Sequence, residues 1–536
     1  MKKIVHFDTL GCRLNQDESE GAARVFYLNG FDVSLEGTSA QTPVNEDVIL
    51  SVINTCTVTS KAEQKARRII RLMLEKYPLS LVLVTGCYAE LDKEEISSIC
   101  PDRILILPGK KKFLITQIAP AMKNGLFDCQ EKNDCLEKSG CQEKNDCQEK
   151  SDCQEKNEKP FLSFKKLDDC IKENLSLLGK IEDENLKEKN NFLQNPGKNN
   201  SGILNIQTLS KLDNFSLYTP VFEKHSRPSI KIQDGCNNEC TFCRIHLARG
   251  KSISLDADKV LARVKELEEG GASEVVFTGV NLSQYAGKTV DGRVIDFASL
   301  LELLIKETSF VKFRISSFYP QHITDRLCKI LSSPRVQPFF HLSVQSGSDK
   351  ILKAMKRPYD AECVLNAVKL LRIYKHAPFI SSDIIAGFPG ESEEDFALTK
   401  KLCRQASFSW IHAFPFSPRK GTPAYDMKNQ IPERIKDERV KWLFENAIEN
   451  KIKYIERFLN EELSAITENS RSLRLKNQSE NKKIVNCVTE NFIHVQIPFD
   501  QEIPNGKKIN VKITKVLEEN IRGGKEVEAE GKIILG

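Results

Sequence analysis

Three cysteines in one short loop constrain this chain more than any other feature. Cys236, Cys240 and Cys243 have the spacing Cys-x3-Cys-x2-Cys. Three thiolates this close together suit a cluster of four irons, and they leave one iron without a protein ligand. An open metal position is what a catalytic site retains and a structural site closes. The loop also follows an apolar stretch at 230–232, so we expect it to lie at the end of a strand in an α/β fold.

A structural zinc site is the alternative for this loop. Zinc takes four sulfur or nitrogen ligands, and His246 lies three residues after Cys243 as a candidate for the fourth. Small zinc-binding loops are uncommon within a region where strands and helices alternate regularly. The surrounding sequence therefore favours the cluster.

Strands and helices alternate over residues 1–125 and again over 223–455, which predicts parallel sheets in both parts. The first part has expected strands at 4–9, 48–54, 81–85 and 104–107, and helices at 17–28, 60–76 and 92–99. This order predicts a doubly wound sheet. The second part has expected strands at 229–232, 274–278, 313–316, 339–344, 379–385 and 410–416, and helices at 257–269, 297–307, 393–406 and 432–458. Six such strands are enough for a partial (β/α) barrel.

The remaining two segments differ in composition from these. Residues 461–536 contain short alternating strands separated by glycine turns, which predicts a small β-barrel. Residues 126–222 are rich in lysine and glutamate, and cysteines recur every six residues at 129, 135, 141, 147 and 153. This segment has too few apolar residues to offset the conformational entropy that is lost on folding. We therefore expect an unstructured insertion. A repeat without catalytic role is favoured over a chelator of soft metals, because a period of six puts the thiols on different faces of a helix.

A second set of cysteines stands at equivalent places in the first α/β part. Cys12, Cys56 and Cys87 each come just after an expected strand. Ligands bind at the carboxyl ends of the strands in an open parallel sheet. The topology therefore predicts a second three-thiolate site at one sheet edge, again with an open iron. The alternative is that they are buried cysteines acting as small hydrophobic residues.

The bulk properties set the compartment and exclude a membrane protein. Seventeen cysteines in a chain of 536 residues without a secretory segment indicate metal or redox chemistry in a reducing cytoplasm, not a disulfide frame. No apolar run reaches the roughly 18 residues that a membrane span needs. The net charge of +5 is compatible with a nucleic-acid partner but does not establish one.

Several motifs together make the chain resemble the radical S-adenosylmethionine (SAM) methylthiotransferases. The matching segments, beside the loop at 235–243, are 9–20 (TLGCRLNQDESE), 54–59 (NTCTVT), 85–90 (TGCYAE), 341–348 (HLSVQSGS), 383–391 (DIIAGFPGE) and 415–423 (PFSPRKGTP). The resemblance covers the whole chain except the insertion and is weakest in the tail, which is similar to an RNA-binding TRAM barrel. Within the family, the segment at 54–59 looks most like the MtaB type.

The resemblance implies a reaction on tRNA. MtaB-type enzymes place a methylthio group on carbon C2 of N6-threonylcarbamoyladenosine at position 37, using two [4Fe–4S] clusters and two SAM molecules. Cys236, Cys240 and Cys243 would hold the cluster that binds and cleaves SAM. The auxiliary cluster on Cys12, Cys56 and Cys87 would hold the sulfur that is methylated and transferred. The sister branches act on isopentenyladenosine of tRNA or on an aspartate of a ribosomal protein.

The resemblance also implies contacts to SAM and partners for the reaction. The expected SAM contacts are Phe242, Gly279, Asn281, Gln345, Gly387 and Glu391. A basic run on the expected helix after Cys56 is a candidate for contact with RNA, against the usual meaning of a solvated helix face, and contains Lys65, Arg67, Arg68 and Arg71. The reaction needs a flavodoxin- or ferredoxin-like electron donor and a sulfur donor. Two other kinds of protein stay open, a two-cluster electron carrier and a radical SAM methyltransferase with a purely structural second cluster.

Overall fold

The computed structural model describes residues 3–123, 127–128, 161–185, 209, 211–221, 226–471, 483–499 and 503–534. The chain forms two compact units. The first consists of residues 1–10, 21–56 and 63–217, and the second of residues 11–20, 57–62 and 218–536. The segments that follow Cys12 and Cys56 thus belong to the second unit, although the strands before them belong to the first.

The first unit is built on a five-stranded parallel sheet with the order β2-β1-β3-β4-β5. Its strands are β1 (Ile4–Thr9), β2 (Asp32–Ser34), β3 (Val48–Thr55), β4 (Leu81–Gly86) and β5 (Ile104–Ile106). Strand order reverses between β1 and β3, as in a doubly wound fold. The fold class predicted from the alternation is therefore confirmed for this unit, although the short strand β2 and several helices were not predicted.

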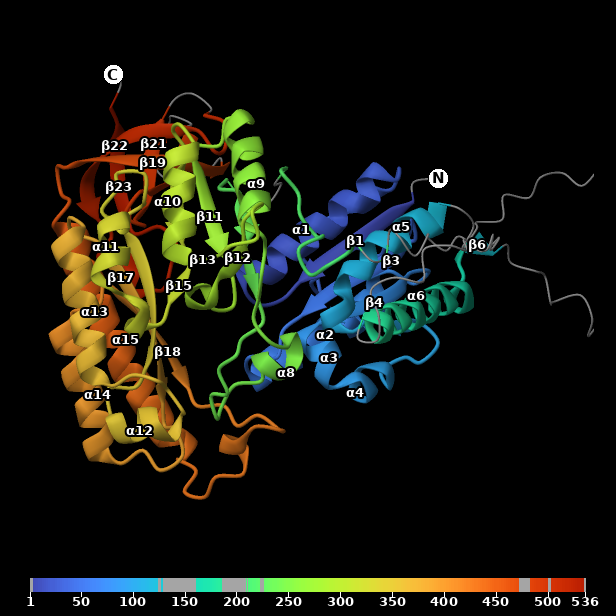
Figure 1. The fold of residues 1–536 in the computed structure, drawn as a ribbon, viewed down its shortest axis with the longest axis horizontal. Helices are drawn as coiled ribbons and strands as arrows, with labels where there is room; N and C mark the ends of the chain where they lie inside the picture. The colour runs from blue at the N-terminus through green and yellow to red at the C-terminus, as the bar shows by residue number, and fades with distance from the viewer. Residues whose placement is uncertain are drawn as a thin grey trace, which may run out of the picture. The chain divides into compact units, whose positions relative to one another are not determined.

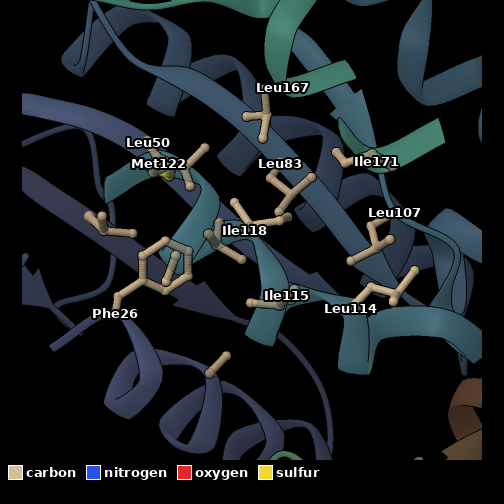
Figure 2. Close-up of a cluster of buried hydrophobic side chains, with 14 of the residues drawn as sticks. Phe26, Leu50, Leu83, Leu107, Leu114, Ile115, Ile118, Met122, Leu167 and Ile171 are labelled. Atoms are coloured by element: carbon tan, nitrogen blue, oxygen red, sulfur yellow. The ribbon is translucent and has the colours of Figure 1, made fainter. Parts of the chain in front are cut away.

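Successive residues of the central strands point to opposite faces of the sheet, because the side-chain period of a strand is two. On β4, Leu81 and Leu83 join one buried apolar cluster, whereas Val82 and Val84 join another. Figure 2 shows part of the first cluster, where residues of α1, α5 and α6 surround Leu50 and Leu83. The helices that supply apolar side chains to the two faces are α1 (Arg13–Leu28), α5 (Ile115–Lys123) and α6 (Phe164–Asn185) for the first, and α2 (Ser60–Lys76), α3 (Cys87–Leu91) and α4 (Lys93–Ser97) for the second.

The expectation of an unstructured segment over 126–222 is wrong for its described part. Helix α6 contributes Leu167, Ile171 and Leu178 to the core of the first unit. These residues recur at helical spacing, so they form one apolar stripe that the surrounding lysines and acidic residues hide in the composition. Phe127 also pairs with Leu162 in a short antiparallel bridge between β6 (Phe127–Asp128) and β7 (Phe161–Leu162). The cysteines at 129–153 lie outside the described residues.

The second unit contains the predicted partial barrel. Strands β8, β11 and β14 form one parallel sheet, and β15, β16, β17 and β18 form another. Only Ser316 separates β14 from β15, so the first sheet continues into the second and together they form an open barrel. The strands are β8 (Ser229–Lys231), β11 (Glu274–Thr278), β14 (Lys312–Ile315), β15 (Ser317–Phe318), β16 (Phe339–Gln345), β17 (Phe379–Ala386) and β18 (Trp410–Pro415).

Helices of this unit cover the outer side of the barrel strands (Figure 1). They are α9 (Ala257–Glu269), α10 (Phe297–Glu307), α11 (Asp325–Leu331), α12 (Asp349–Ala354), α13 (Ala361–Tyr374), α14 (Glu393–Ala406) and α15 (Glu433–Glu456). The bounds of α9, α10 and α14 agree with the sequence prediction to the residue. The Asp296 and Ser392 side chains cap α10 and α14 by accepting backbone hydrogen bonds, whereas Asp256 precedes α9 without such a bond. In α14, Ser392 and Asp395 form a capping box.

The chain ends in a closed five-stranded barrel, which confirms the prediction for the tail. Its order is β19-β20-β21-β23-β22, with strands Glu462–Arg471, Lys483–Thr489, His494–Phe499, Ala529–Ile533 and Lys508–Val516 in that order. Val495 and Val511 of this barrel share a buried cluster with Ile452 and Ile455 of α15 and with Phe379 of β17. None of the helices within the described ranges is long and apolar enough to cross a membrane.

Candidate iron–sulfur sites

The cysteine loop at 236–243 lies directly after β9 (Gln233–Asp234) and leads into α8 (Ile245–Arg249). Gly235 starts the loop with a φ of +70°. A Cβ atom there would lie 2.0 Å from the Lys251 carbonyl oxygen, so only glycine fits. The Cys236 amide then donates a hydrogen bond to the Gly250 carbonyl oxygen at 3.0 Å. These contacts fix the start of the loop against Gly250 and Lys251, which directly follow α8.

Each of the three sulfur atoms accepts at least one hydrogen bond from a nitrogen. The donors are the Asn238 amide to Cys236 at 3.4 Å, the Ile245 amide to Cys243 at 3.4 Å and the Arg357 guanidinium to Cys240 at 3.2 Å. Hydrogen bonds to cluster sulfurs are one of the means by which a protein tunes an iron–sulfur centre. The loop is therefore arranged to receive negatively charged sulfur at all three positions.

The spacing of the ligand atoms bears on the zinc alternative for this loop. Two ligands of one zinc ion lie at most about 4.6 Å apart, which is twice a Zn–S bond of about 2.3 Å. Over the part of the chain that the structure describes, no three of Cys236, Cys240, Cys243 and His246 have ligand atoms all within 4.8 Å of one another. A cubane spreads its thiolates over separate irons and so holds them farther apart. The four side chains as they stand in the structure do not converge on a single zinc ion.

Burial raises the cost of a negative charge at this loop. It raises the pKa of the Cys236 thiol, and it raises the pKa of Cys243 to about 12. Positively charged iron reverses this effect, because a coordinating thiol is deprotonated outright. Cys236 and Cys243 would therefore carry a negative charge readily only with a positive charge, such as a bound metal, beside them.

Gly279 and Asn281 follow β11 and lie beside the cysteine loop. The Asn281 amide donates to Gln233 Oε1 at 2.8 Å, and its side chain hydrogen-bonds the Cys236 thiol. A Cβ at Gly279 would lie 2.8 Å from Leu282 Cδ2 and 3.0 Å from Gln233 Oε1. The structure therefore brings both residues to the loop.

Gln345, Gly387 and Glu391 lie at the carboxyl ends of the adjacent parallel strands β16 and β17. Gln345 has a φ of 85°, a strained conformation for a residue with a Cβ. The Glu391 carboxylate accepts hydrogen bonds from the Gly387 amide at 2.6 Å and from Arg439 at 2.5 Å. Glu391 therefore holds the turn at 387–391 in shape.

Phe242 occupies an apolar environment within the second unit. Its half-buried ring packs against a buried cluster that includes Met355, Phe388 and Phe416. The preceding residue, Thr241, donates its hydroxyl to the Ala354 carbonyl oxygen at 2.9 Å. These contacts hold the last turn of the cysteine loop against the barrel helices.

Cys56 and Cys87 stand directly after the adjacent parallel strands β3 and β4, and Cys12 comes three residues after the end of β1. Cys56 and Cys87 are buried, and Cys12 is exposed. Gly86, just before Cys87, has a φ of +97°, and a Cβ there would lie 2.4 Å from the Thr55 carbonyl oxygen. The backbones before Cys56 and Cys87 thus approach each other as closely as glycine allows.

A buried charge network was missed by the sequence analysis. Glu18 accepts hydrogen bonds from Lys231 Nζ at 2.6 Å and from Arg249 Nη1 at 3.2 Å. Asp234 accepts from the same two cations, at 2.6 and 2.8 Å. Arg249 also donates to Asn15 Oδ1 at 2.6 Å. The first turns of α1 after Cys12 are therefore bound to the strand and helix that flank the cysteine loop.

Asp17 adds a second anchor for the same part of α1. It accepts hydrogen bonds from the hydroxyls of Ser229 on β8 and Thr278 at the end of β11, the latter at 2.8 Å. Burial, partly offset by Arg13, raises its pKa. The only sequence signal for these anchors is the polar run QDESE at 16–20, which is unusual for a helix whose residues are buried.

The segment after Cys56 is anchored by two buried arginines. Thr57 Oγ1 accepts hydrogen bonds from Arg419 at 2.9 Å and from Arg244 at 3.2 Å. Arg419 also donates to Ser60 Oγ at 3.1 Å, and Ser60 shares a hydrogen bond with Ser417 at 2.9 Å. The residue after Cys56 is thus bonded to the residue after Cys243.

The basic run on α2 divides into two kinds of residue. Lys65, Arg68 and Arg71 are exposed at a spacing of three, so they share one face of the helix. Arg67 is partly buried, where it donates to the Tyr88 hydroxyl at 2.7 Å and pairs with Glu95 at 2.9 Å. The first three are available to a partner, whereas Arg67 supports the contact between α2 and the α3–α4 segment.

Comparison with known proteins agrees with this architecture. Residues 230–403 match the Radical SAM superfamily, and residues 4–107 match the uncharacterized protein family UPF0004. A threonylcarbamoyladenosine tRNA methylthiotransferase MtaB of Treponema pallidum (strain Nichols) is 40% identical over 496 residues, 92% of this chain and 94% of the relative. The protein of that name in Bacillus subtilis (strain 168) is 30% identical over 513 residues, 95% of this chain and 94% of the relative.

A relative named for a different base is similar to a lesser degree. The tRNA-2-methylthio-N(6)-dimethylallyladenosine synthase of Photobacterium profundum is 28% identical over 531 residues, 98% of this chain and 92% of the relative. The alignments with these three relatives cover 92%, 95% and 98% of the chain. The chain belongs to the radical SAM methylthiotransferase family, to its MtaB type, and is a radical SAM enzyme.

Proposed function

We propose that this chain transfers a methylthio group to ring carbon C2 of N6-threonylcarbamoyladenosine at position 37 of tRNA, in the cytoplasm. Two relatives named for a threonylcarbamoyladenosine tRNA methylthiotransferase align with 92% and 95% of the chain. The relative named for dimethylallyladenosine is less similar, at 28% identity. The segment NTCTVT at 54–59 supports the same choice of substrate.

The proposal assigns the six cysteines to two [4Fe–4S] clusters. Cys236, Cys240 and Cys243 hold the cluster that binds SAM, and Cys12, Cys56 and Cys87 hold the auxiliary cluster that carries sulfur. The observation that carries this assignment is the hydrogen bond from Arg244 to Thr57 at 3.2 Å, because these residues directly follow Cys243 and Cys56. A reaction that uses a radical and a sulfur atom together needs the two ligand loops to be held in register.

The chemistry explains why such cofactors are needed. When bound, the first cluster and SAM supply a deoxyadenosyl radical, which functionalises an unactivated ring carbon that acid–base groups cannot. The chain's own residues bind and orient the cofactor and the substrate, and they exclude water from the site. Asn281, Gln345 and the turn at 387–391 lie at the carboxyl ends of barrel strands, where barrel enzymes bind their ligands. Phe242, Gly279, Gly387 and Glu391 complete the proposed SAM site, Glu391 through the turn that it holds.

The proposal includes three partners. The tRNA would contact the exposed face of α2 through Lys65, Arg68 and Arg71, with Arg67 supporting that helix, since phosphates attract clustered basic side chains. The five-stranded C-terminal barrel, similar to a TRAM domain, would add a second RNA contact. A flavodoxin- or ferredoxin-like protein would supply electrons, a separate donor would supply sulfur, and two SAM molecules would be used per product.

The test is the nucleoside composition of tRNA in cells. Total tRNA is digested from cells that lack the gene and from cells complemented with the parent chain or with Cys236→Ala, and modified adenosines are quantified by mass spectrometry. We expect the methylthio form of threonylcarbamoyladenosine to disappear without the gene and to return only with the parent chain. Threonylcarbamoyladenosine itself should accumulate.

The same digest distinguishes the alternatives. If instead the methylthio form of isopentenyladenosine disappears, the substrate assignment is wrong but the reaction stands. If every tRNA nucleoside is unchanged, the target is another molecule, such as an aspartate of a ribosomal protein. A two-cluster electron carrier would leave all methylthio marks in place and would not cleave SAM.

A further inference from the structure

Arg357 has an unusual set of neighbours for a buried cation. It lies between α12 and α13, and its side chain is buried. Its guanidinium donates four hydrogen bonds to other groups of the chain. These run from Nη1 to Cys240 Sγ at 3.2 Å and to the Tyr319 hydroxyl at 2.8 Å, from Nη2 to the Ser343 carbonyl oxygen at 2.9 Å, and from Nε to the Tyr359 hydroxyl at 2.7 Å.

The two tyrosines also fix the plane of the guanidinium. Its central carbon lies 4.3 Å from the ring centre of Tyr319 and 5.2 Å from that of Tyr359. The two rings meet edge to face, with centres 6.1 Å apart. An arginine held by two aromatic rings and by its own nitrogens has little rotamer freedom left. The Arg357 N–H group that donates to Cys240 therefore has a fixed orientation.

The counter-charge of Arg357 is what distinguishes it. Buried cations are normally paired with a carboxylate, as Arg249, Arg314 and Arg439 are with Asp234, Glu274 and Glu391. The buried Arg244 and Arg419 donate hydrogen bonds to hydroxyl groups. The four hydrogen bonds of Arg357 go to a sulfur, two hydroxyls and a carbonyl oxygen, and none of the four goes to a carboxylate. The Asp383 carboxylate interacts electrostatically with the Arg357 charge. The sulfur partner of Arg357 is Cys240, which would be a thiolate when it holds iron.

We infer that Arg357 is a positioning residue that sets the reduction potential of the cluster held by Cys236, Cys240 and Cys243. The inference rests on the proposed cluster assignment and goes beyond it. Reduction adds negative charge to a cluster, and a fixed cation that donates a hydrogen bond to a cluster sulfur stabilises the reduced state. Cys236 and Cys243 accept from backbone amides, and Cys236 also from the Asn281 side chain, and none of these donors carries a net charge. Among the three, Cys240 alone accepts a hydrogen bond from a positively charged group. Arg357 is therefore the side chain that sets the reduction potential of this cluster.

The test is a redox titration of the full chain, followed by electron paramagnetic resonance. In a background with Cys12, Cys56 and Cys87 changed to alanine, only one cluster contributes to the signal. Arg357→Gln removes the charge and keeps a polar side chain, and Arg357→Lys keeps the charge without the planar fork. Arg335→Gln is the matched control, since Arg335 donates to the carbonyl oxygens of Val311 and Thr308 and to no sulfur.

We expect Arg357→Gln to shift the midpoint potential downward with iron content unchanged, Arg357→Lys to give a smaller downward shift, and Arg335→Gln to give none. A parent-like potential in Arg357→Gln with full iron content would overturn the inference. If Arg357→Gln does not retain iron, Arg357→Lys decides in its place, and a parent-like potential there overturns the inference. If the background chain itself binds no cluster, the proposed function fails, which is a separate outcome.

Discussion

Arg244 donates a hydrogen bond to the hydroxyl of Thr57 at 3.2 Å, and each of the two residues directly follows a proposed cluster ligand. The two residues are 187 positions apart in the sequence, so no local motif could bring them together. Arg419 donates to the same hydroxyl at 2.9 Å. Thr57 is therefore the acceptor through which two buried guanidinium groups hold the segment after Cys56.

Changing Thr57→Val should loosen this segment without changing its shape, because valine lacks the hydroxyl but has a similar volume. A buried donor left without its acceptor costs about 1–3 kcal/mol, so the melting temperature of the chain should fall. Methylthio transfer should fall more than SAM cleavage does. Thr57→Ser, which keeps the hydroxyl, is the control, and both activities are measured on chains with equal iron content. Equal loss of activity in the two variants would contradict this role.

Glu18→Gln should be strongly destabilising. Glu18 is buried and accepts from both Lys231 and Arg249, so the variant leaves two buried cations with one carboxylate fewer. Removing one partner of a buried ion pair typically costs about 3–5 kcal/mol. Thermal unfolding of Glu302→Gln, on the exposed face of α10, provides the baseline. A melting temperature for Glu18→Gln equal to that of Glu302→Gln would show that the network does not stabilise the fold.

Gly235→Ala should prevent cluster assembly. The substitution adds a methyl group 2.0 Å from the Lys251 carbonyl oxygen, and the loop that presents Cys236 must shift to avoid it. Gly292→Ala is a close control, because Gly292 has a similar φ of +81° but open space around its Cβ position. Iron content after anaerobic reconstitution separates the two. Retention of iron by Gly235→Ala would contradict the geometry described for the loop.

Asp395 should stabilise the fold at neutral pH and cease to do so in acid. Burial opposes its ionisation, but the Lys350 ammonium at 2.6 Å and donors on Ser392 and Ser348 outweigh burial and lower its pKa to about 2. A carboxyl group with a lowered pKa contributes stability above its unfolded pKa of about 3.9, and that contribution disappears as the pH falls through the folded value. The difference in melting temperature between the parent and Asp395→Asn should therefore shrink between pH 4 and about pH 2. A constant difference would rule out this account of the cap.

Features that depend on local pattern could be predicted from the sequence. The strand at Ile4–Thr9 and the helix at Ser60–Lys76 were predicted with the bounds observed, because period and flanking turns define them within a few residues. The three cysteines at 236–243 were proposed as ligands from their spacing and from the strands and helices around them, and this assignment stays a prediction. The doubly wound sheet then followed from the order of the elements.

Features that depend on long-range packing could not be predicted. The contact of Arg357 with Cys240 joins residues 117 positions apart, and that of Glu18 with Lys231 joins residues 213 apart. Helix α6 was missed for a different reason, because Leu167, Ile171 and Leu178 become a core only against the sheet of the first unit. The amino-acid composition of a segment does not show such an apolar stripe, whereas the packing of the helix depends on it.

The most direct test of the two-site account compares Cys236→Ala with Cys56→Ala in one assay. Each full-length variant is reconstituted without oxygen and given SAM, dithionite and tRNA that carries threonylcarbamoyladenosine. Deoxyadenosine and methylthio nucleoside are measured together by mass spectrometry. We predict both products from the parent chain, neither from Cys236→Ala, and deoxyadenosine without methylthio nucleoside from Cys56→Ala. Methylthiolated tRNA from the Cys56→Ala chain would contradict the assignment of the auxiliary cluster.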